Sequence, residues 1–67
     1  MVHITNRVFE LRKEINVTQE DLAKAVKVSR QTVIAIEKGN YTPSVLLALK
    51  IAQYFKKSVE EIFIHKK

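Results

Sequence analysis

Helix-capping signals recur along the chain at short intervals, and they limit any helix that it forms to a few turns. Thr18 stands before Gln-Glu-Asp, and Ser29 stands before a run of helix-compatible residues. Hydroxyl side chains at such positions accept hydrogen bonds from the free N–H groups of a helix's first turn. Thr42 precedes Pro43, a residue favoured at the first helical position, and Ser58 begins a capping box closed by a glutamate three residues on. The pattern predicts several short helices joined by turns.

Apolar residues follow these signals at helical spacing. A first helix capped by Asn6 is expected to run to about Glu14, and a fourth from the Thr42-Pro43 signal to about Phe55. The residues expected to face inward in the first three helices are Val8, Leu11 and Ile15, then Leu22, Ala23 and Val26, then Val33 and Ile36. One face of the fourth helix is expected to hold Val45, Ala48, Leu49, Ala52 and Phe55, although Leu46, Leu47 and Ile51 widen the apolar arc.

Both ends of the chain have β-favouring residues. The short runs are Val2-His3-Ile4 and Phe63-Ile64-His65, and one could pair with the other across the fold. Paired strands would bring His3 and His65 together, but two histidines fall short of the three or four ligands of a zinc site, so we expect no metal.

Length and composition exclude several classes of protein. The chain has 67 residues, no cysteine, one glycine and one proline, so it forms one domain without disulfides and lacks the glycines of a P-loop or a dinucleotide fingerprint. Neither Asp21 nor Glu60-Glu61 has a nucleophile or base partner at a credible spacing, so we expect no enzyme and no cofactor. A core this small supplies only about 3–5 kcal/mol, and burial against a second copy is the available reinforcement.

Membrane insertion and export are also unexpected. The longest uncharged stretch, residues 39–49, is far shorter than the roughly 20 apolar residues of a membrane span. The N-terminus has no signal-peptide pattern. We therefore expect a soluble cytoplasmic protein, and its net charge of +5 favours polyanionic partners.

The stretch from Gln19 to Lys38 carries the functional signal, because it predicts two short helices joined by about three residues. Ala23 places only a methyl group where the helices would cross. The outward positions of the later helix are Arg30, Gln31, Thr32 and Ala35, of which the first three lie in its opening turn. An α-helix enters the DNA major groove with this end leading, so these side chains can reach base edges.

This stretch resembles the helix-turn-helix transcriptional regulators of the Cro and cI phage-repressor type. The resemblance runs from about residue 6 to 63, and its most specific parts are Thr18-Gln19 with Leu22-Ala23, the segment VSRQTV at 28–33, Ile36-Glu37-Lys38-Gly39, and Pro43-Ser44. It implies an all-α, five-helix lambda-repressor-like domain over residues 1–67, with the motif at about 19–38, that binds operator DNA as a dimer. The strand-like ends look like those of compact members similar to the cytolysin repressor, in which terminal strands pair.

The resemblance also implies roles for individual residues. Arg30, Gln31 and Thr32 would read bases, and Ala35 would at most contact a thymine methyl group. Four residues would hold backbone phosphates, namely Gln19, Asn40, Tyr41 and Thr42. The resemblance also allows Gln19 to brace the recognition helix. Arg12 and Glu37 match positions that form a partly buried, structural ion pair between helices one and three. Lys27 stands where many relatives have a glycine with positive φ, which implies strain of roughly 1–2 kcal/mol.

These residues favour a sequence-specific transcriptional regulator, a repressor that binds an inverted-repeat operator on double-stranded DNA as a homodimer. The alternative is a protein-interaction module or antitoxin that uses the same fold and covers its wide apolar arc with another protein. Phe9, Tyr54, Leu46 and Ile64 are larger apolar groups than a solvated surface needs, so they are either spare core or part of a subunit interface. No sensor segment or small-molecule effector is evident.

Overall fold

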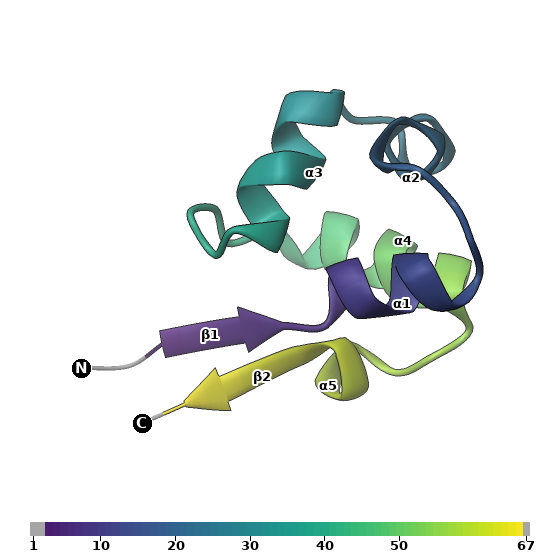
Figure 1. The fold of residues 1–67 in the computed structure, drawn as a ribbon. Helices are drawn as coiled ribbons and strands as arrows, with labels where there is room; N and C mark the ends of the chain where they lie inside the picture. The colour runs from purple at the N-terminus through teal and green to yellow at the C-terminus, as the bar shows by residue number, and fades with distance from the viewer. Residues whose placement is uncertain (1–2, 67) are drawn as a thin grey trace.

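A computed structural model describes residues 3–66 of the chain. In Figure 1 the first four of its five short helices lie above a two-stranded antiparallel sheet, and the last helix leads directly into the second strand. The elements in chain order are β1 (His3–Asn6), α1 (Val8–Glu14), α2 (Gln19–Val26), α3 (Arg30–Glu37), α4 (Val45–Phe55), α5 (Val59–Ile62) and β2 (Phe63–Lys66). The five-helix fold with a small terminal sheet is therefore confirmed.

The predicted caps of α2, α3 and α5 form as expected. Thr18 and Ser58 each accept a hydrogen bond from the backbone N–H three residues on, and each closes a reciprocal capping box, with Asp21 and Glu61 respectively. The Ser29 hydroxyl accepts from the N–H of Thr32 at 3.1 Å. These local bonds determine where the helices begin, because each satisfies an N–H group that has no partner within the helix.

The start of α4 differs from the prediction. Ser44, not Thr42, is the cap: its hydroxyl accepts from the N–H of Leu47 at 3.1 Å, and the helix begins at Val45. Pro43 therefore precedes the helix and does not occupy its first position. The later start leaves residues 40–44 as a connection without helix or strand between α3 and α4.

The buried face of α4 is also different from the one predicted. Leu47, Ala48, Ile51 and Ala52 are buried, whereas Val45 and Leu49 are exposed. Because the apolar arc of α4 is so wide, its sequence alone does not determine which face is buried. Packing against both α2 and α5 decides how the helix is rotated about its axis.

The first helix ends at Glu14 as predicted, but its cap and the burial of Ile15 differ from the prediction. Arg7 occupies the cap position, and Asn6 lies one residue earlier, where its Oδ1 still accepts from the N–H of Val8 at 3.1 Å. Ile15 is 52% exposed, not buried. The helix ends at Glu14 and the chain turns at Asn16, whose φ is 64°, so the apolar stripe is interrupted before it reaches Ile15.

The chain ends pair as the sequence suggested. β1 and β2 are antiparallel, with Ile4 opposite His65 and Thr5 opposite Ile64. Both strands extend one or two residues beyond the predicted runs, while Val2 lies outside the described residues. The Arg7 N–H also donates to the carbonyl of Ile62 at 2.9 Å, which ties the start of α1 to the end of α5.

One hydrophobic core connects all five helices. Its buried members are Val8, Leu11, Leu22, Ala23, Val26, Val33, Ile36, Leu47, Ile51, Ala52 and Ile62. Of the four residues considered as spare core or interface, Tyr54 packs against this core, Ile64 is half-buried, and Phe9 and Leu46 are exposed. Within residues 3–66, no helix is both long enough and apolar enough to cross a membrane.

Candidate nucleic-acid interface

The helix-turn-helix unit is built by close packing of α2 on α3. Ala23 is buried between the helices, and its carbonyl accepts from the N–H of Val28 at 3.0 Å, which closes the turn. Lys27 is the C-cap of α2 and has φ 63°. This agrees with the family resemblance, in which many relatives have a glycine with positive φ at this position. The turn therefore keeps its shape although it lacks glycine, at a cost of roughly 1–2 kcal/mol for the left-handed side chain.

The first turn of α3 presents its polar side chains to solvent. Arg30 and Gln31 are exposed, and among the described residues Arg30 has no carboxylate within 4.0 Å. Thr32 is half-buried, and its hydroxyl lies 3.0 Å from the hydroxyl of Ser29. Ala35, one turn later, is half-buried. The two long, hydrogen-bonding tips at this end are thus free to contact a ligand.

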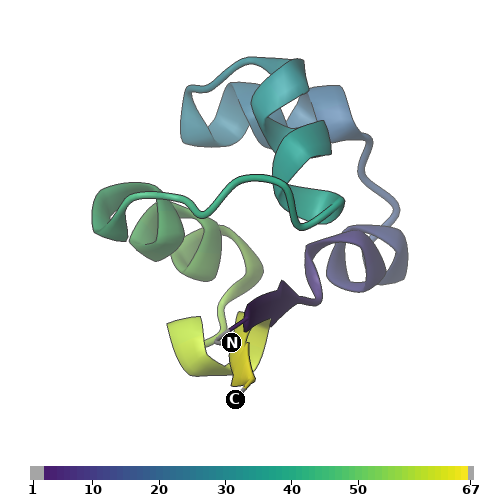
Figure 2. The same ribbon diagram turned by 90° about the vertical axis from the view of Figure 1, so that its left-hand side faces the viewer.

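The connection between α3 and α4 lies on the same face of the molecule as α3 (Figure 2). Gly39, with φ 80°, ends α3, and the Asn40 N–H donates to the carbonyl of Ala35 at 2.9 Å. This places Asn40, Tyr41 and Thr42, all exposed, beyond the C-terminal end of the exposed helix. The connection that carries three predicted phosphate-holding residues therefore lies on the same face as the helix that carries the predicted base-reading residues.

Arg12 and Glu37 form a buried ion pair that joins α1 to α3. The Arg12 Nε donates to Glu37 Oε2 at 2.7 Å and Nη2 donates to Oε1 at 3.2 Å, with each side chain only 7% exposed. Nη1 of the same guanidinium donates to the carbonyl of Val17 at 3.1 Å. Among the described residues, no buried side-chain polar atom lacks a partner, so the pair is fully satisfied.

Gln19 is held by this ion pair. Its Nε2 donates to Glu37 Oε1 at 3.1 Å, which links the first residue of α2 to the last residue of α3. Gln19 is consequently half-buried and fixed in orientation. The bracing role that the resemblance allowed for Gln19 corresponds to this hydrogen bond.

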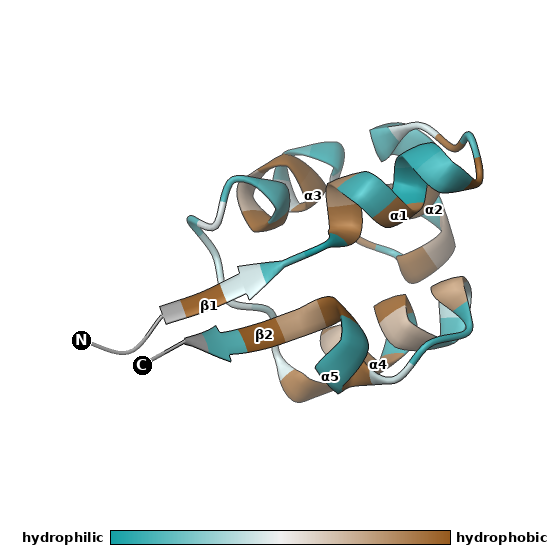
Figure 3. Cartoon of the chain, turned by 60° about the horizontal axis from the view of Figure 1, so that its bottom comes forward, coloured by the Kyte–Doolittle hydropathy of each residue, from teal (hydrophilic) through white to brown (hydrophobic). Residues whose placement is uncertain are grey.

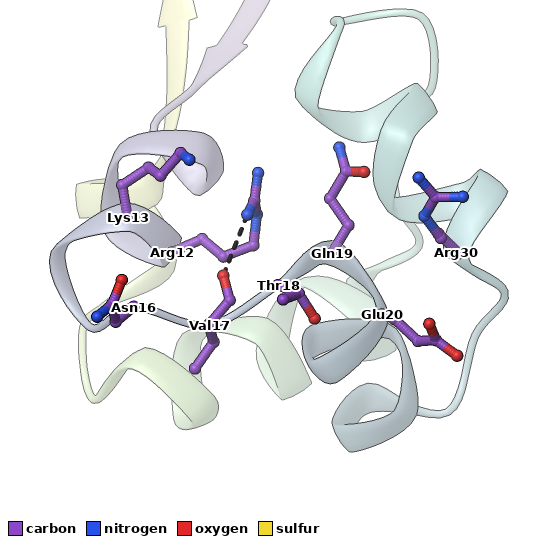
Figure 4. Close-up of a pocket in the computed structure, with 8 residues that line it drawn as sticks. All are labelled: Arg12, Lys13, Asn16, Val17, Thr18, Gln19, Glu20 and Arg30. Atoms are coloured by element: carbon purple, nitrogen blue, oxygen red, sulfur yellow. Dashed lines mark hydrogen bonds between the residues drawn. The ribbon is translucent and has the colours of Figure 1, made fainter.

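A polar pocket opens beside Gln19 (Figure 4). Its volume is about 590 Å³, and the residues that line it are Arg12, Lys13, Asn16, Val17, Thr18, Gln19, Glu20 and Arg30. Arg12, Gln19 and Arg30 extend in the same direction from α1, α2 and α3 (Figure 4). Lys13 and Asn16 were missed by the sequence reasoning, because nothing in the spacing of α1 indicates that its last turn borders the start of α2 and α3.

Two capping carboxylates among the described residues, Asp21 and Glu61, have a lowered pKa. The pKa of Asp21 is lowered mainly by the hydrogen bond from the backbone N–H of Thr18 and next by the hydrogen bond with its side chain. The backbone and side chain of Ser58 lower the pKa of Glu61 in the same way. Neither group belongs to the surface formed by α3 and residues 40–42. Among the described residues, no three histidine, cysteine or carboxylate side chains are grouped as metal ligands, and the side chain of His3 lies outside the described part.

Several known proteins are similar to this chain in sequence. A helix-turn-helix family model matches residues 8–62. An uncharacterized HTH-type transcriptional regulator of Methanocaldococcus jannaschii is 57% identical over 60 residues, which are 90% of this chain and 91% of that protein. The phage CTXphi transcriptional repressor RstR of Vibrio cholerae is 28% identical over 58 residues, which are 87% of this chain and 52% of that protein.

A solved structure has the same arrangement. The restriction-modification controller protein C.AhdI of Aeromonas hydrophila superposes with a TM-score of 0.76 at 31% identity, over 82% of this chain and 83% of that one. The helices described above are thus shared with a protein of known structure.

Proposed function

The chain belongs to the helix-turn-helix family of transcriptional regulators, and from that premise we propose that it is a repressor that binds an inverted-repeat operator as a homodimer. Two copies would set one α3 helix in each of two successive major grooves, about 34 Å apart. Bound in this way, the dimer would block or alter access of RNA polymerase to the promoter. The protein would act where its DNA is, in the cytoplasm, without catalysis.

The observation that carries the proposal is the exposure of Arg30 and Gln31 at the capped N-terminus of α3. Arginine pairs bidentately with guanine and glutamine with adenine, and each good pair contributes about 1–3 kcal/mol of discrimination. Thr32 shares its hydroxyl with Ser29, so its contribution to base reading would be smaller. Ala35 offers only a methyl group, suited to contact with a thymine methyl.

Phosphate contacts would come from both sides of α3. Gln19, held by Glu37, and Asn40, Tyr41 and Thr42 would hold the backbone and set the register of the helix without reading sequence. The polar pocket adds to this set Lys13, an exposed cation that lines the same pocket as Gln19. The net charge of +5 would add attraction that weakens with salt.

The repressor part of the proposal is supported by the similarity to the phage repressor RstR, and the DNA-binding part by the match to the helix-turn-helix family and to its transcriptional regulators. The homodimer is supported by the small core and by the exposed apolar residues of α4. An inverted repeat follows from a two-fold symmetric dimer.

Selection of bound sequences from random duplexes tests this function. Recovery of a palindrome with half-sites one helical turn apart is expected. On that duplex, Gln31→Ala should weaken binding by about 1–3 kcal/mol, whereas Gln53→Ala, an exposed glutamine on α4, should leave it unchanged. Failure to enrich any sequence, or equal losses for the two variants, would contradict base reading by α3.

The alternative is a protein-interaction module or antitoxin with the same fold, which the exposed apolar side chains of α4 also permit. The two functions differ in their response to salt. Titration of a labelled duplex at two salt concentrations separates them. An operator-binding protein loses affinity steeply at the higher concentration, because phosphate contacts release counterions, whereas an interaction module shows no saturable binding to the duplex at low or high salt.

A further inference from the structure

Phe9 is an exposed aromatic residue of α1 that the core does not use. It is 50% exposed, and among the described residues it is neither a member of the hydrophobic core nor one of the apolar side chains packed against that core. In Figure 3 the beginning of α1, where Phe9 lies, has the hydrophobic colour, and hydrophilic residues follow toward the end of the helix. The ring therefore needs an explanation other than burial in the core.

Two cations lie at this ring. The guanidinium carbon of Arg12 is 5.3 Å from the ring centroid, and the Nζ of Lys13 is 5.5 Å from it. Both distances are within the roughly 6 Å over which the face of an aromatic ring attracts a cation. Phe9 precedes Arg12 by three residues and Lys13 by four, and side chains at these spacings are neighbours on a helix. The contact is thus a local property of α1.

The two cations differ in what else holds them. The guanidinium of Arg12 is fixed by its hydrogen bonds to Glu37 and to the carbonyl of Val17, and Glu37 compensates its charge. Lys13 is exposed, and among the described residues no carboxylate lies within 4.0 Å of its ammonium group. The contact with the ring therefore matters more for the orientation of Lys13 than for that of Arg12.

Lys13 lies at one side of the polar pocket beside Gln19. In Figure 4 Lys13 extends from α1 on one side of this pocket and Arg30 from α3 on the other, with Gln19 between them. Glu20, the acid among the lining residues, pairs with Lys24 at 3.8 Å. Two cations without a carboxylate partner thus lie at opposite sides of the pocket, and an anionic oxygen of the DNA backbone has the matching charge.

We propose that Phe9 is a positioning residue of the DNA interface: its ring holds the ammonium group of Lys13 at the polar pocket, where that group binds a backbone phosphate. The inference rests on the proposed DNA binding and extends the interface to a residue outside the helix-turn-helix unit. The side chain of lysine is a flexible four-carbon stem, so its ammonium group occupies many positions on a free helix surface. The ring favours the positions in which the ammonium group lies over it.

The size of the effect follows from the population of these positions. A cation–π contact at an exposed site raises that population by about 2- to 5-fold. When a binding-competent conformation is only partly populated, the observed affinity is reduced by its fraction. Removal of the ring should therefore weaken DNA binding by up to about 2- to 5-fold. The phosphate contact itself is still made, because the lysine is still present.

The test is titration of labelled duplexes over a range of salt concentrations with the parent, Phe9→Leu, Lys13→Gln and the double variant. Leucine keeps an apolar side chain that suits a helix but has no ring. Phe9→Leu should weaken binding by about 2- to 5-fold and leave the slope of log affinity against log salt unchanged. Lys13→Gln should reduce that slope by about 0.9, since one phosphate contact is lost. The double variant should bind as Lys13→Gln does alone, because the ring acts through the ammonium group.

Three controls separate positioning from a structural effect. Phe9→Tyr keeps a ring and should bind as the parent does. Ile15→Ala removes an apolar side chain that is 52% exposed, close to the exposure of Phe9, and should also bind as the parent does. A mixed-sequence duplex should show the same losses as the selected palindrome, because a phosphate contact does not read sequence. Circular dichroism should show the same helix content for every variant.

The possible results are distinct. Parent affinity in Phe9→Leu would overturn the inference and leave DNA binding intact. Losses that add in the double variant would also overturn it, since the ring would then act independently of Lys13. A change in the sedimentation equilibrium of Phe9→Leu would overturn it by placing the ring in a subunit interface. Failure to select a palindrome would refute the operator function alone, because the mixed-sequence duplex still measures the role of Phe9. A parent that binds neither duplex would refute both.

Discussion

Removal of Arg12 should destabilise the protein more than any surface substitution, because its partner would be left buried and charged. Glu37 is 7% exposed, and without the guanidinium its remaining hydrogen bond among the described residues comes from Gln19. Removing one member of a buried ion pair costs about 3–5 kcal/mol. That equals the whole stability expected of a core this size, about 3–5 kcal/mol, so Arg12→Ala should be largely unfolded at room temperature.

Urea and thermal unfolding followed by circular dichroism measure this loss. Arg7→Ala is the matched control, because Arg7 pairs with Glu10 at 3.7 Å and Glu14 at 4.0 Å but is 39% exposed, and exposed pairs contribute at most about 1 kcal/mol. A domain of this length shifts its melting temperature by roughly 4–8 °C per kcal/mol, so the two variants should differ clearly. Equal melting temperatures for Arg12→Ala, Arg7→Ala and the parent would refute the structural role of the buried pair.

Three further predictions concern the ends of helices. Lys27→Gly should raise the free energy of unfolding by up to about 1 kcal/mol, since relief of the left-handed strain at φ 63° exceeds the entropy cost of glycine; a lower melting temperature would argue against strain there. Ser44→Ala should cost about 1 kcal/mol and Thr42→Ala almost nothing, because Ser44 is the observed cap; the reverse order by urea titration would place the cap at Thr42. Hydrogen bonds lower the pKa of Asp21 and Glu61 in the folded state, so the two carboxylates stabilise the fold above their unfolded pKa, and this stabilisation is lost as pH falls through the folded pKa. Acid should therefore lower the melting temperature of the parent more than that of the double variant Asp21→Asn, Glu61→Gln. Parallel profiles of melting temperature against pH would contradict this prediction.

Features decided by neighbouring residues could be predicted from the sequence. The caps at Thr18, Ser29 and Ser58 depend on hydrogen bonds between residues three positions apart, so they can be recognised from the sequence without knowledge of the fold. The pairing of the terminal runs also followed from β propensity together with the family resemblance. The left-handed conformation of Lys27 was implied by the relatives. Asparagine tolerates positive φ, so the residue type at Asn16 is compatible with its turn, but Lys56 gives no such signal.

Features decided by packing could not be predicted. Every position of α4 from Val45 to Leu49 is apolar, so only the contacts with α2 and α5 determine that Leu47 and Ala48 are buried. In the candidate site, the resemblance indicated Arg30, Gln31 and Gln19, whereas Lys13 joins the polar pocket because α1 ends close to the start of α2 in space. Whether a second copy covers Leu46 is likewise a property of the assembly.

The most direct test of the account is a pair of selections from random duplexes, one with the parent and one with Gln31→Ala. The account predicts a palindrome for the parent, and for the variant the same palindrome with the base preference lost at one position in each half-site. An unchanged preference at every position would show that the first turn of α3 does not read the DNA.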